Sequence, residues 1–147
     1  MAEDLMKVAR ENIEAFNSGD WTRYEKTLAP DSLYEEYGTQ RKIQGPAKIV
    51  QANRDWKMAF PDAKGTIANS YGSGTTVVLE LTWEGTQSGP LQGPGGSIPP
   101  TGKRAKLPAI MVLAFDGGKI KRSHHYFDFM TLLQQIGAET KVSPATR

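Results

Sequence analysis

Hydrophobic and polar residues follow a helical rhythm before Pro61 and a strand rhythm after it. From Ala2 to Asn17 the apolar residues recur at steps of three and four positions, which predicts an amphipathic helix with one buried stripe. Ser18-Gly19 follows where a helix C-terminus is expected. The stripe consists of Leu5, Val8, Ala9, Ile13 and Phe16.

Two further helices are predicted in this first part of the chain. Asp20 can cap a short helix that runs to Leu28, and Ala29-Pro30-Asp31 ends it. Residues 32–37 then have the composition of a strand. Gly45-Pro46 opens a longer helix, since proline is favourable at a first helical position. This helix has an apolar side made of Ile49, Val50, Asn53, Trp56 and Phe60.

From Lys64 to Phe127 the pattern predicts strands in antiparallel succession, because the connections are short and rich in glycine. From Val77 to Trp83 the odd-numbered apolar residues face one way and the even-numbered residues face the other. One face of the sheet is therefore expected to be covered. We predict an α+β domain in which the N-terminal helices close the concave side of a curved antiparallel sheet, with a cavity between the layers.

Length and composition narrow the possibilities. A chain of 147 residues fits one domain, which we expect over residues 1–138, followed by a flexible tail over 139–147. The net charge of +2 and the scattered basic residues do not favour nucleic acid as a partner. The chain has no cysteine and begins with acidic residues where a signal peptide would be basic. No membrane span is evident in the sequence, so we expect a cytoplasmic protein.

A segment dense in glycine and proline, residues 89–102, interrupts the strand pattern. It predicts a long hairpin loop, which is either a lid or binding loop or a plain mobile tip. Gly102-Lys103 does not form a phosphate-binding loop. Ser97 stands where that motif needs glycine, Arg104 replaces its Ser/Thr, and no helix follows.

Five pieces of the chain carry a family resemblance: Trp56–Asp62, Trp83–Gly89, Pro100–Lys103, Phe115–Ile120, and Asp128 with Leu132–Gly137. On these residues the chain resembles the SnoaL-like polyketide cyclases, also called ester cyclases, of the nuclear transport factor 2-like superfamily. The resemblance implies a cone-shaped α+β barrel with a deep apolar pocket, commonly dimeric through its sheet. It is less specific for chemistry, because this fold hosts cyclases, isomerases, epoxide hydrolases and non-catalytic binders.

The resemblance implies that Asp128 is a general acid/base in an intramolecular aldol ring closure that needs no metal and no cofactor. Counting by twos from Ile120 places Arg122, His124, Tyr126 and Asp128 on one strand face, unless a bulge shifts the register. His124 would then orient a substrate carbonyl beside Asp128. An apolar pocket would raise the pKa of the Asp128 carboxyl toward the working pH. The alternative is that Asp128 only caps the helix that begins at Phe129.

His124 and His125 are adjacent, so on a strand they point to opposite faces and do not chelate one metal. Of Glu35 and Glu36, one carboxylate points inward, where it either forms an acid/base pair with Asp128 or an ion pair with arginine. Gln87 stands where the resembled family often has histidine; it can bond a ligand oxygen but moves no proton. Aromatic residues at inward positions line a pocket for a flat ligand or are plain core. The predicted ligand contacts are Gln87, Trp83, Trp56, Phe60, Tyr37, Tyr126 and Arg122.

Three functions therefore compete. The first is a cofactor-free enzyme on a hydrophobic carbonyl compound, with Asp128 as acid/base and His124 and Gln87 positioning the oxygen. The second is an isomerase or an epoxide hydrolase of the same fold, for which Arg122 and Asp128 supply only part of an Asp-Arg-Asp set. The third is a small-molecule-binding or homodimeric module without turnover.

Overall fold

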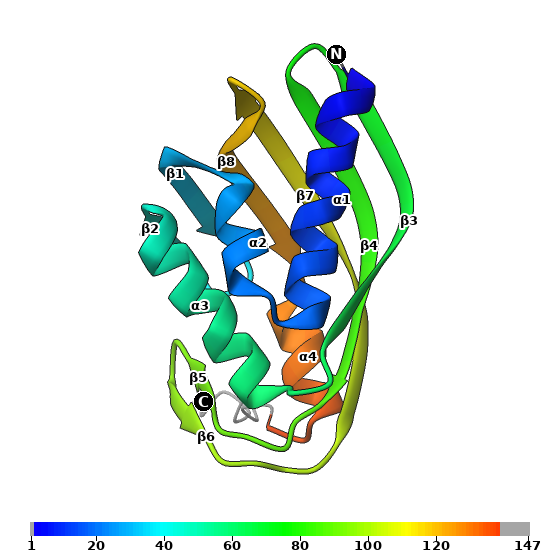
Figure 1. The fold of residues 1–147 in the computed structure, drawn as a ribbon. Helices are drawn as coiled ribbons and strands as arrows, with labels where there is room; N and C mark the ends of the chain where they lie inside the picture. Colours follow the sequence, from blue (N-terminus) through cyan, green and yellow to red (C-terminus); the bar gives the residue numbers. More distant parts are fainter. Residues whose placement is uncertain (1, 139–147) are drawn as a thin grey trace, which may run out of the picture.

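The computed structural model describes residues 2–138, in which helices cover one side of a curved sheet of six strands (Figure 1). The predicted tail over 139–147 lies outside the described residues. The helices are α1 (Ala2–Ser18), α2 (Trp21–Lys26), α3 (Pro46–Ala59) and α4 (Phe129–Gln135). The sequence predicted each of them, with Asp20 and Asp128 as the N-caps of α2 and α4. No helix in this part of the chain has the length and apolar character of a membrane span.

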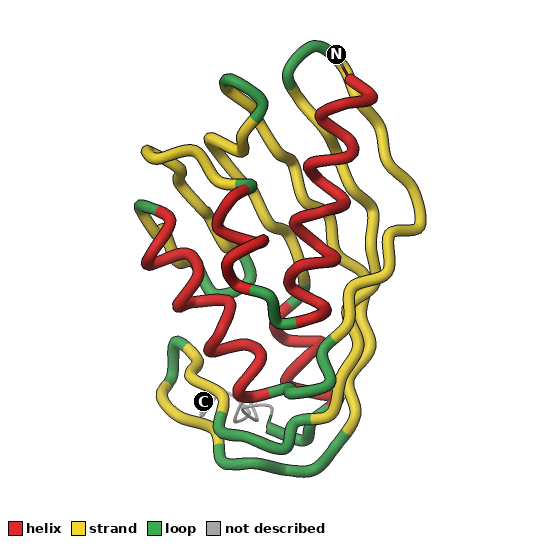
Figure 2. Tube along the Cα trace, in the orientation of Figure 1, coloured by secondary structure: helices red, strands yellow, loops and turns green. Residues whose placement is uncertain are grey.

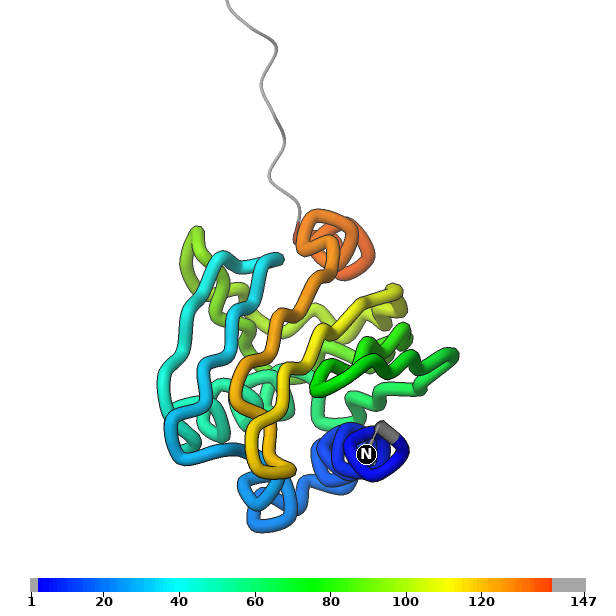
Figure 3. Tube along the Cα trace, turned by 90° about the horizontal axis from the view of Figure 1, so that it is seen from above, coloured from blue at the N-terminus to red at the C-terminus, as the bar shows by residue number. Residues whose placement is uncertain are grey.

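The main sheet has the order β2-β1-β8-β7-β4-β3. Its strands are β1 (Leu28–Glu36), β2 (Arg41–Gln44), β3 (Lys64–Ser73), β4 (Thr76–Thr86), β7 (Arg104–Asp116) and β8 (Lys119–Phe127). The prediction of a purely antiparallel sheet is wrong at one place, because β1 and β8 are parallel neighbours. Figure 3 shows β1, β8, β7 and β4 side by side. The sheet stays open between its edges β2 and β3 rather than closing into a barrel.

The core lies between the helices and the inner face of this sheet, as the two layers of Figure 2 show. The predicted stripe of α1 supplies Ile13 and Phe16, which are buried. On β4 the odd-numbered residues Val77, Leu79 and Leu81 are buried against them, as the alternation predicted. Burial of these side chains drives the packing of the two layers.

An extra residue on β8 reverses which of the following side chains face the core. Phe115 on β7 pairs with Ile120, whereas the preceding Ala114 pairs with Arg122, so Lys121 has no partner of its own. Such a bulge shifts the alternation by one position. Beyond it, Ser123 and His125 are buried on the inner face. The expected inward placement is therefore right for Ile120 and wrong for Arg122, His124 and Tyr126.

The glycine- and proline-rich connection is an ordered structure fastened by Gln87. It carries a small hairpin of β5 (Leu91–Gly93) and β6 (Gly96–Ile98). The fully buried Gln87 amide donates from Nε2 to the carbonyls of Gly89, Ile98 and Pro99 at 3.1–3.3 Å. Its Oε1 accepts the Thr101 amide at 3.2 Å and the Thr101 hydroxyl at 2.8 Å. One side chain thus ties the two ends of the connection together.

Gly89 joins this connection to the end of α3, and we expect alanine there to be destabilising. The Ser88 and Gly89 amides both donate to the Ala59 carbonyl at 3.1 Å, and a Cβ on Gly89 would overlap the Met58 carbonyl oxygen. Gly89→Ala should lower the free energy of unfolding by about 1–3 kcal/mol, the usual cost of overpacking. Denaturant unfolding measures it, with Gly95→Ala as the control because nothing lies within 4 Å of that Cβ. Equal stability of the two variants would contradict this account.

Candidate functional site

An apolar pocket lies at the end of the core that α3 and α4 share with the inner face of the sheet. Its volume is about 80 Å³. Aromatic rings from four segments of the chain, α1, α3 with its C-cap, β4 and β8, line it: Phe16, Trp56, Phe60, Trp83 and Phe127. Trp56, Phe60 and Trp83 are thus in the pocket wall where the sequence expected them; that they contact a ligand stays a prediction.

The indole of Trp83 is held in one place by its neighbours. Gly65 on β3 is its cross-strand partner, and a Cβ on Gly65 would lie only 2.6 Å from the indole ring. Phe16 packs edge-on against the same ring at a centroid distance of 5.0 Å. The absence of a side chain at Gly65 therefore makes room for Trp83 against the inner face of the sheet.

Trp83 donates a hydrogen bond to His125, and this bond defines the state of the imidazole. The Nε1 atom of Trp83 lies 3.0 Å from Nε2 of His125. Because an indole N–H can only donate, Nε2 must be unprotonated, and the proton of the neutral ring is on Nδ1. Burial lowers the pKa of His125 to about 4, although the nearby Glu36 acts in the opposite direction. At neutral pH His125 is thus an uncharged acceptor toward Trp83.

The other side of His125 begins a chain of hydrogen bonds that ends on a buried carboxylate. Nδ1 of His125 lies 2.7 Å from the Tyr34 hydroxyl, to which it donates. The Tyr34 hydroxyl in turn donates to Oε2 of Glu36 at 2.8 Å. Burial and the Glu36 charge raise the pKa of Tyr34 well above its usual value, so the hydroxyl keeps its proton. The direction of donation runs from Trp83 through His125 and Tyr34 to Glu36.

Glu36 is 1% exposed and remains charged because its oxygens are fully partnered. Burial alone would raise the pKa of Glu36, but the Arg41 charge and several hydrogen bonds lower it below the usual range. Arg41 bonds Oε1 through Nε at 3.0 Å and Nη2 at 2.9 Å, so the ion pair that the sequence left open is formed. Trp56 Nε1 donates to Oε2 at 2.9 Å, and the Thr39 hydroxyl donates to Oε1 at 2.5 Å. Such a buried charge is stable only with this degree of pairing.

The structure does not bring His124 and Asp128 into the pocket. Because of the bulge, His124 lies on the outer face of the sheet, with its Nε2 atom 3.8 Å from Oε1 of Glu35. Asp128 is exposed and caps α4, accepting the Thr131 hydroxyl at 2.9 Å and the Thr131 amide at 3.2 Å. The hydroxyl and amide bonds of Thr131 lower the pKa of Asp128, whereas a pocket acid would have it raised. The expected placement in the pocket is wrong, and Asp128 forms the helix cap that the alternative described.

Four of the predicted ligand contacts also lie outside the pocket. Arg122 and Tyr126 face outward after the bulge. Tyr37 stacks on Tyr126 at a centroid distance of 4.5 Å and an interplanar angle of 4°. The amide of Gln87 is used by the glycine- and proline-rich connection. These residues therefore have structural surroundings that differ from the expected ones.

Three residues supply polar groups to the pocket wall without having been proposed from the sequence as ligand contacts: Tyr34, Asn53 and His125. Tyr34 and Glu36 alternate on one strand, which signals a shared face, but their link to His125 depends on the bulge. His124 and His125 lie on opposite faces of β8, as predicted. Within residues 2–138 no three His, Asp or Glu side chains are grouped to hold a metal ion.

Comparison with known proteins identifies one family. The family model described as SnoaL-like polyketide cyclase matches residues 6–136. A search of curated proteins finds no match.

Solved structures with similar folds cover almost the whole chain. A putative SnoaL-like polyketide cyclase from Jannaschia sp. CCS1 has a TM-score of 0.84 at 17% identity, covering 95% of both chains. AclR, a putative hydroxylase from Streptomyces galilaeus, has a TM-score of 0.80 at 22% identity, covering 97% of this chain and 91% of its own. A ketosteroid isomerase-like protein from Catenulispora acidiphila has a TM-score of 0.78 at 17% identity, covering 93% and 97%. At these identities the likeness shows the fold.

The buried, neutral His125 should make stability depend on pH. The unfolded chain protonates this residue near its ordinary pKa of 6.5, and the folded protein only near 4. Between these values the unfolded state binds more protons, so stability is lost as the pH falls from 6.5 to 4, by an amount on the order of 3 kcal/mol. Denaturant unfolding across this range should show a flatter profile for His125→Gln than for the natural protein. His124→Gln, outside the buried chain of hydrogen bonds, is the control and should keep the natural slope; equal slopes in all three proteins would contradict the assignment.

Proposed function

Because this chain belongs to the SnoaL-like polyketide cyclase family, we propose that its pocket binds a hydrophobic carbonyl compound and moves a proton on the carbon next to the carbonyl. The observation that carries the proposal is the pair formed by Trp83 and His125. It places an N–H donor and an unprotonated nitrogen 3.0 Å apart in the wall of an apolar pocket. A carbonyl compound with an acidic α-proton needs one of each.

The proposed step exchanges the Trp83–His125 bond for two bonds to the ligand. The indole N–H of Trp83 donates to the carbonyl oxygen, and Nε2 of His125 takes the α-proton. The electron pair of the broken C–H bond forms the enolate, whose oxygen charge the indole N–H stabilises. The enolate carbon then either regains the proton from His125 or attacks a second carbonyl of the same molecule, as in an aldol closure, in which case the oxygen of that carbonyl becomes an alkoxide and takes the proton from His125.

The hydrogen-bond chain behind His125 supports this role. A histidine whose pKa is about 4 is a weak base, and that value already includes the opposing effect of the Glu36 charge. Its protonated form would be stabilised by the Glu36 charge, which raises the pKa of His125 and is connected to Nδ1 through Tyr34. The Glu36 charge attracts the protonated imidazole much more than the neutral one. It therefore stabilises the state that follows proton transfer more than the resting state.

Pocket size restricts the ligand. The volume of about 80 Å³ is well below the roughly 300–1,000 Å³ of sites that enclose drug-sized ligands. In this form the pocket accepts a small compound or one end of a longer one. A polycyclic substrate that entered as a whole would require the aromatic wall to move, whereas one that inserted only its ketone ring would not.

Deuterium exchange tests the proposal. With 2-tetralone in D2O, proton NMR should show enzyme-dependent loss of the α-proton signals. His125→Gln should slow this exchange by about 100-fold or more, the usual contribution of a general base, and Trp83→Phe by about 100-fold through loss of the oxyanion donor. Asp128→Asn keeps the helix cap and should exchange at the natural rate. Loss of exchange in Asp128→Asn with retention in His125→Gln would overturn the assignment.

A binding module without turnover is the second candidate. It is favoured by the state of the pocket, in which the polar groups of Tyr34, Trp56, Trp83 and His125 are already hydrogen-bonded to protein. The tetralone titration separates the two functions, since Trp56 and Trp83 are in the pocket wall and report binding by fluorescence. Saturable binding without deuterium exchange would identify the module.

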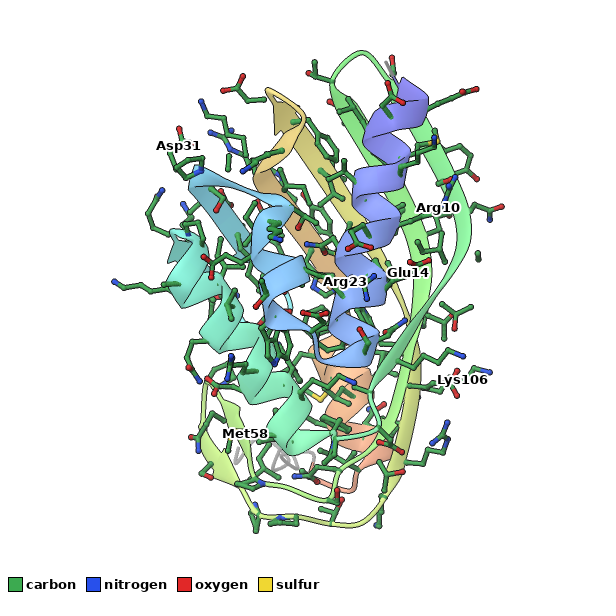
Figure 4. The ribbon with its side chains drawn as sticks, in the orientation of Figure 1. Arg10, Glu14, Arg23, Asp31, Met58 and Lys106 are labelled. Carbon is green, nitrogen blue, oxygen red and sulfur yellow. The ribbon has the colours of Figure 1, made fainter. Side chains whose placement is uncertain are left out.

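We also infer that the outer face of the sheet pairs two copies of the chain. The far side of the helix layer carries charged residues, among them Arg10, Glu14 and Arg23 (Figure 4). The outer face of the sheet instead presents Tyr126 at 43% exposure and Ile110, its neighbour on β7, at 41%. Nε2 of His124 is covered there without a hydrogen-bond partner among the described residues. Exposed apolar side chains that lie together are typical of a surface that another protein covers, and a two-fold contact would cover both copies at once.

Light scattering tests the dimer. The natural protein should have the mass of two chains, and Tyr126→Glu should have the mass of one because it places a charge in the contact. Met58→Glu is the matched control, since Met58 is also exposed (64%) but projects from α3 on the helix side (Figure 4). A natural protein of monomer mass would contradict the inference.

A further inference from the structure

Asn53 is a buried polar residue in an otherwise apolar part of the pocket wall. It is on α3, on the same helix side as Trp56 and Phe60, which also line the pocket. Its exposed fraction is 8%. Asparagine is a weak helix former and is costly to bury, so leucine or alanine would suit this helix position better if packing were the only demand.

The orientation of the Asn53 amide follows from one hydrogen bond. Its Nδ2 atom lies 2.9 Å from the carbonyl oxygen of Ile49, one turn earlier on α3. A carbonyl oxygen only accepts, so the nitrogen of the amide must be on that side and the oxygen on the other. Within the described chain, no donor reaches this Oδ1 atom.

The other polar groups of the wall are occupied. Tyr34 and Trp56 donate to Glu36, Trp83 donates to His125, and Glu84 at the rim accepts from Arg104 at 2.5 Å. Asn53 Oδ1 differs from all of these, because it is a neutral acceptor in the pocket wall whose partner is missing from the described protein. An acceptor in the pocket wall that no protein donor uses is free to accept from a ligand, so a ligand with a donor at this place gains a hydrogen bond.

We propose that Asn53 selects ligands that bring a hydroxyl or N–H donor into the pocket. The ligand class is therefore a small hydrophobic compound with one such donor on the side that faces α3, such as a phenol, an enol or a hydroxylated ketone. This inference rests on the proposed function only in using the same pocket as a binding site. A neutral amide oxygen carries no charge to attract an anion, and the aromatic wall favours a flat, uncharged body.

Two ligands of nearly equal shape test the proposal. In 4-methylphenol a hydroxyl replaces one methyl group of p-xylene, so their affinity ratio measures recognition of the donor. Asn53→Leu keeps the side-chain size and removes the acceptor. We expect it to shift the ratio toward p-xylene by about fivefold or more, because the hydroxyl then enters the pocket unpaired. Gln51→Leu is the matched control, since Gln51 is an exposed amide on the same helix, and it should leave the ratio unchanged.

The outcomes separate this inference from the proposed function. Calorimetry gives the affinities, and circular dichroism checks the folding of each variant. If both ligands bind the natural protein and Asn53→Leu leaves their ratio unchanged, Asn53 does not select the donor, while the pocket remains a binding site. If neither ligand binds the natural protein, this inference fails, whereas the deuterium exchange of a ketone tests the proposed function independently.

A measurement on the natural protein keeps the proposal testable if Asn53→Leu does not fold. The side-chain amide of Asn53 gives its own signals in a proton–nitrogen NMR spectrum. Saturating 4-methylphenol should shift these signals clearly more than saturating p-xylene, because only the phenol bonds the amide. Equal shifts with both ligands would overturn the proposal.

Discussion

The arrangement of the strands and helices around the pocket depends on the need to hydrogen-bond the buried carboxylate of Glu36. Its hydrogen-bond partners come from the turn after β1, from β2 and from α3, and Tyr34 extends the set to β8 and β4. A charge without water must be satisfied by protein groups, so these elements can only be arranged in ways that supply them. The inner end of the pocket is formed by the same arrangement. The side chains that satisfy the Glu36 charge therefore also form part of the proposed reaction site.

Much of the fold was predictable because it depends on local signals. The stripe of α1, the proline at the start of α3 and the cap at Asp128 each act within a few positions of the chain. On β4 the buried odd-numbered residues alternate with even-numbered residues that face the other way. These features need no knowledge of distant partners, and the structure has them where the sequence placed them.

The candidate site was less predictable because it depends on one residue that leaves no local signal. Lys121 is an exposed lysine that any strand tolerates, yet as the bulged residue it exchanges the orientations of His124 and His125. The hydrogen bonds of Gln87 could not be predicted for a related reason. Most of its partners are backbone groups up to 14 positions away, and a sequence does not state which carbonyls a loop will bring together.

The parallel pairing of β1 with β8 has a consequence for biosynthesis. Tyr34 and His125, which meet across these strands, are 91 positions apart, and β8 is the last strand of the sheet. During translation β1 and β7 leave the ribosome before β8, which lies between them in the sheet. Until β8 is made, each of them has one edge without a pairing strand. Contacts of such long sequence separation form slowly, and open strand edges invite association with other chains. The pocket therefore forms only after β8 has been synthesised.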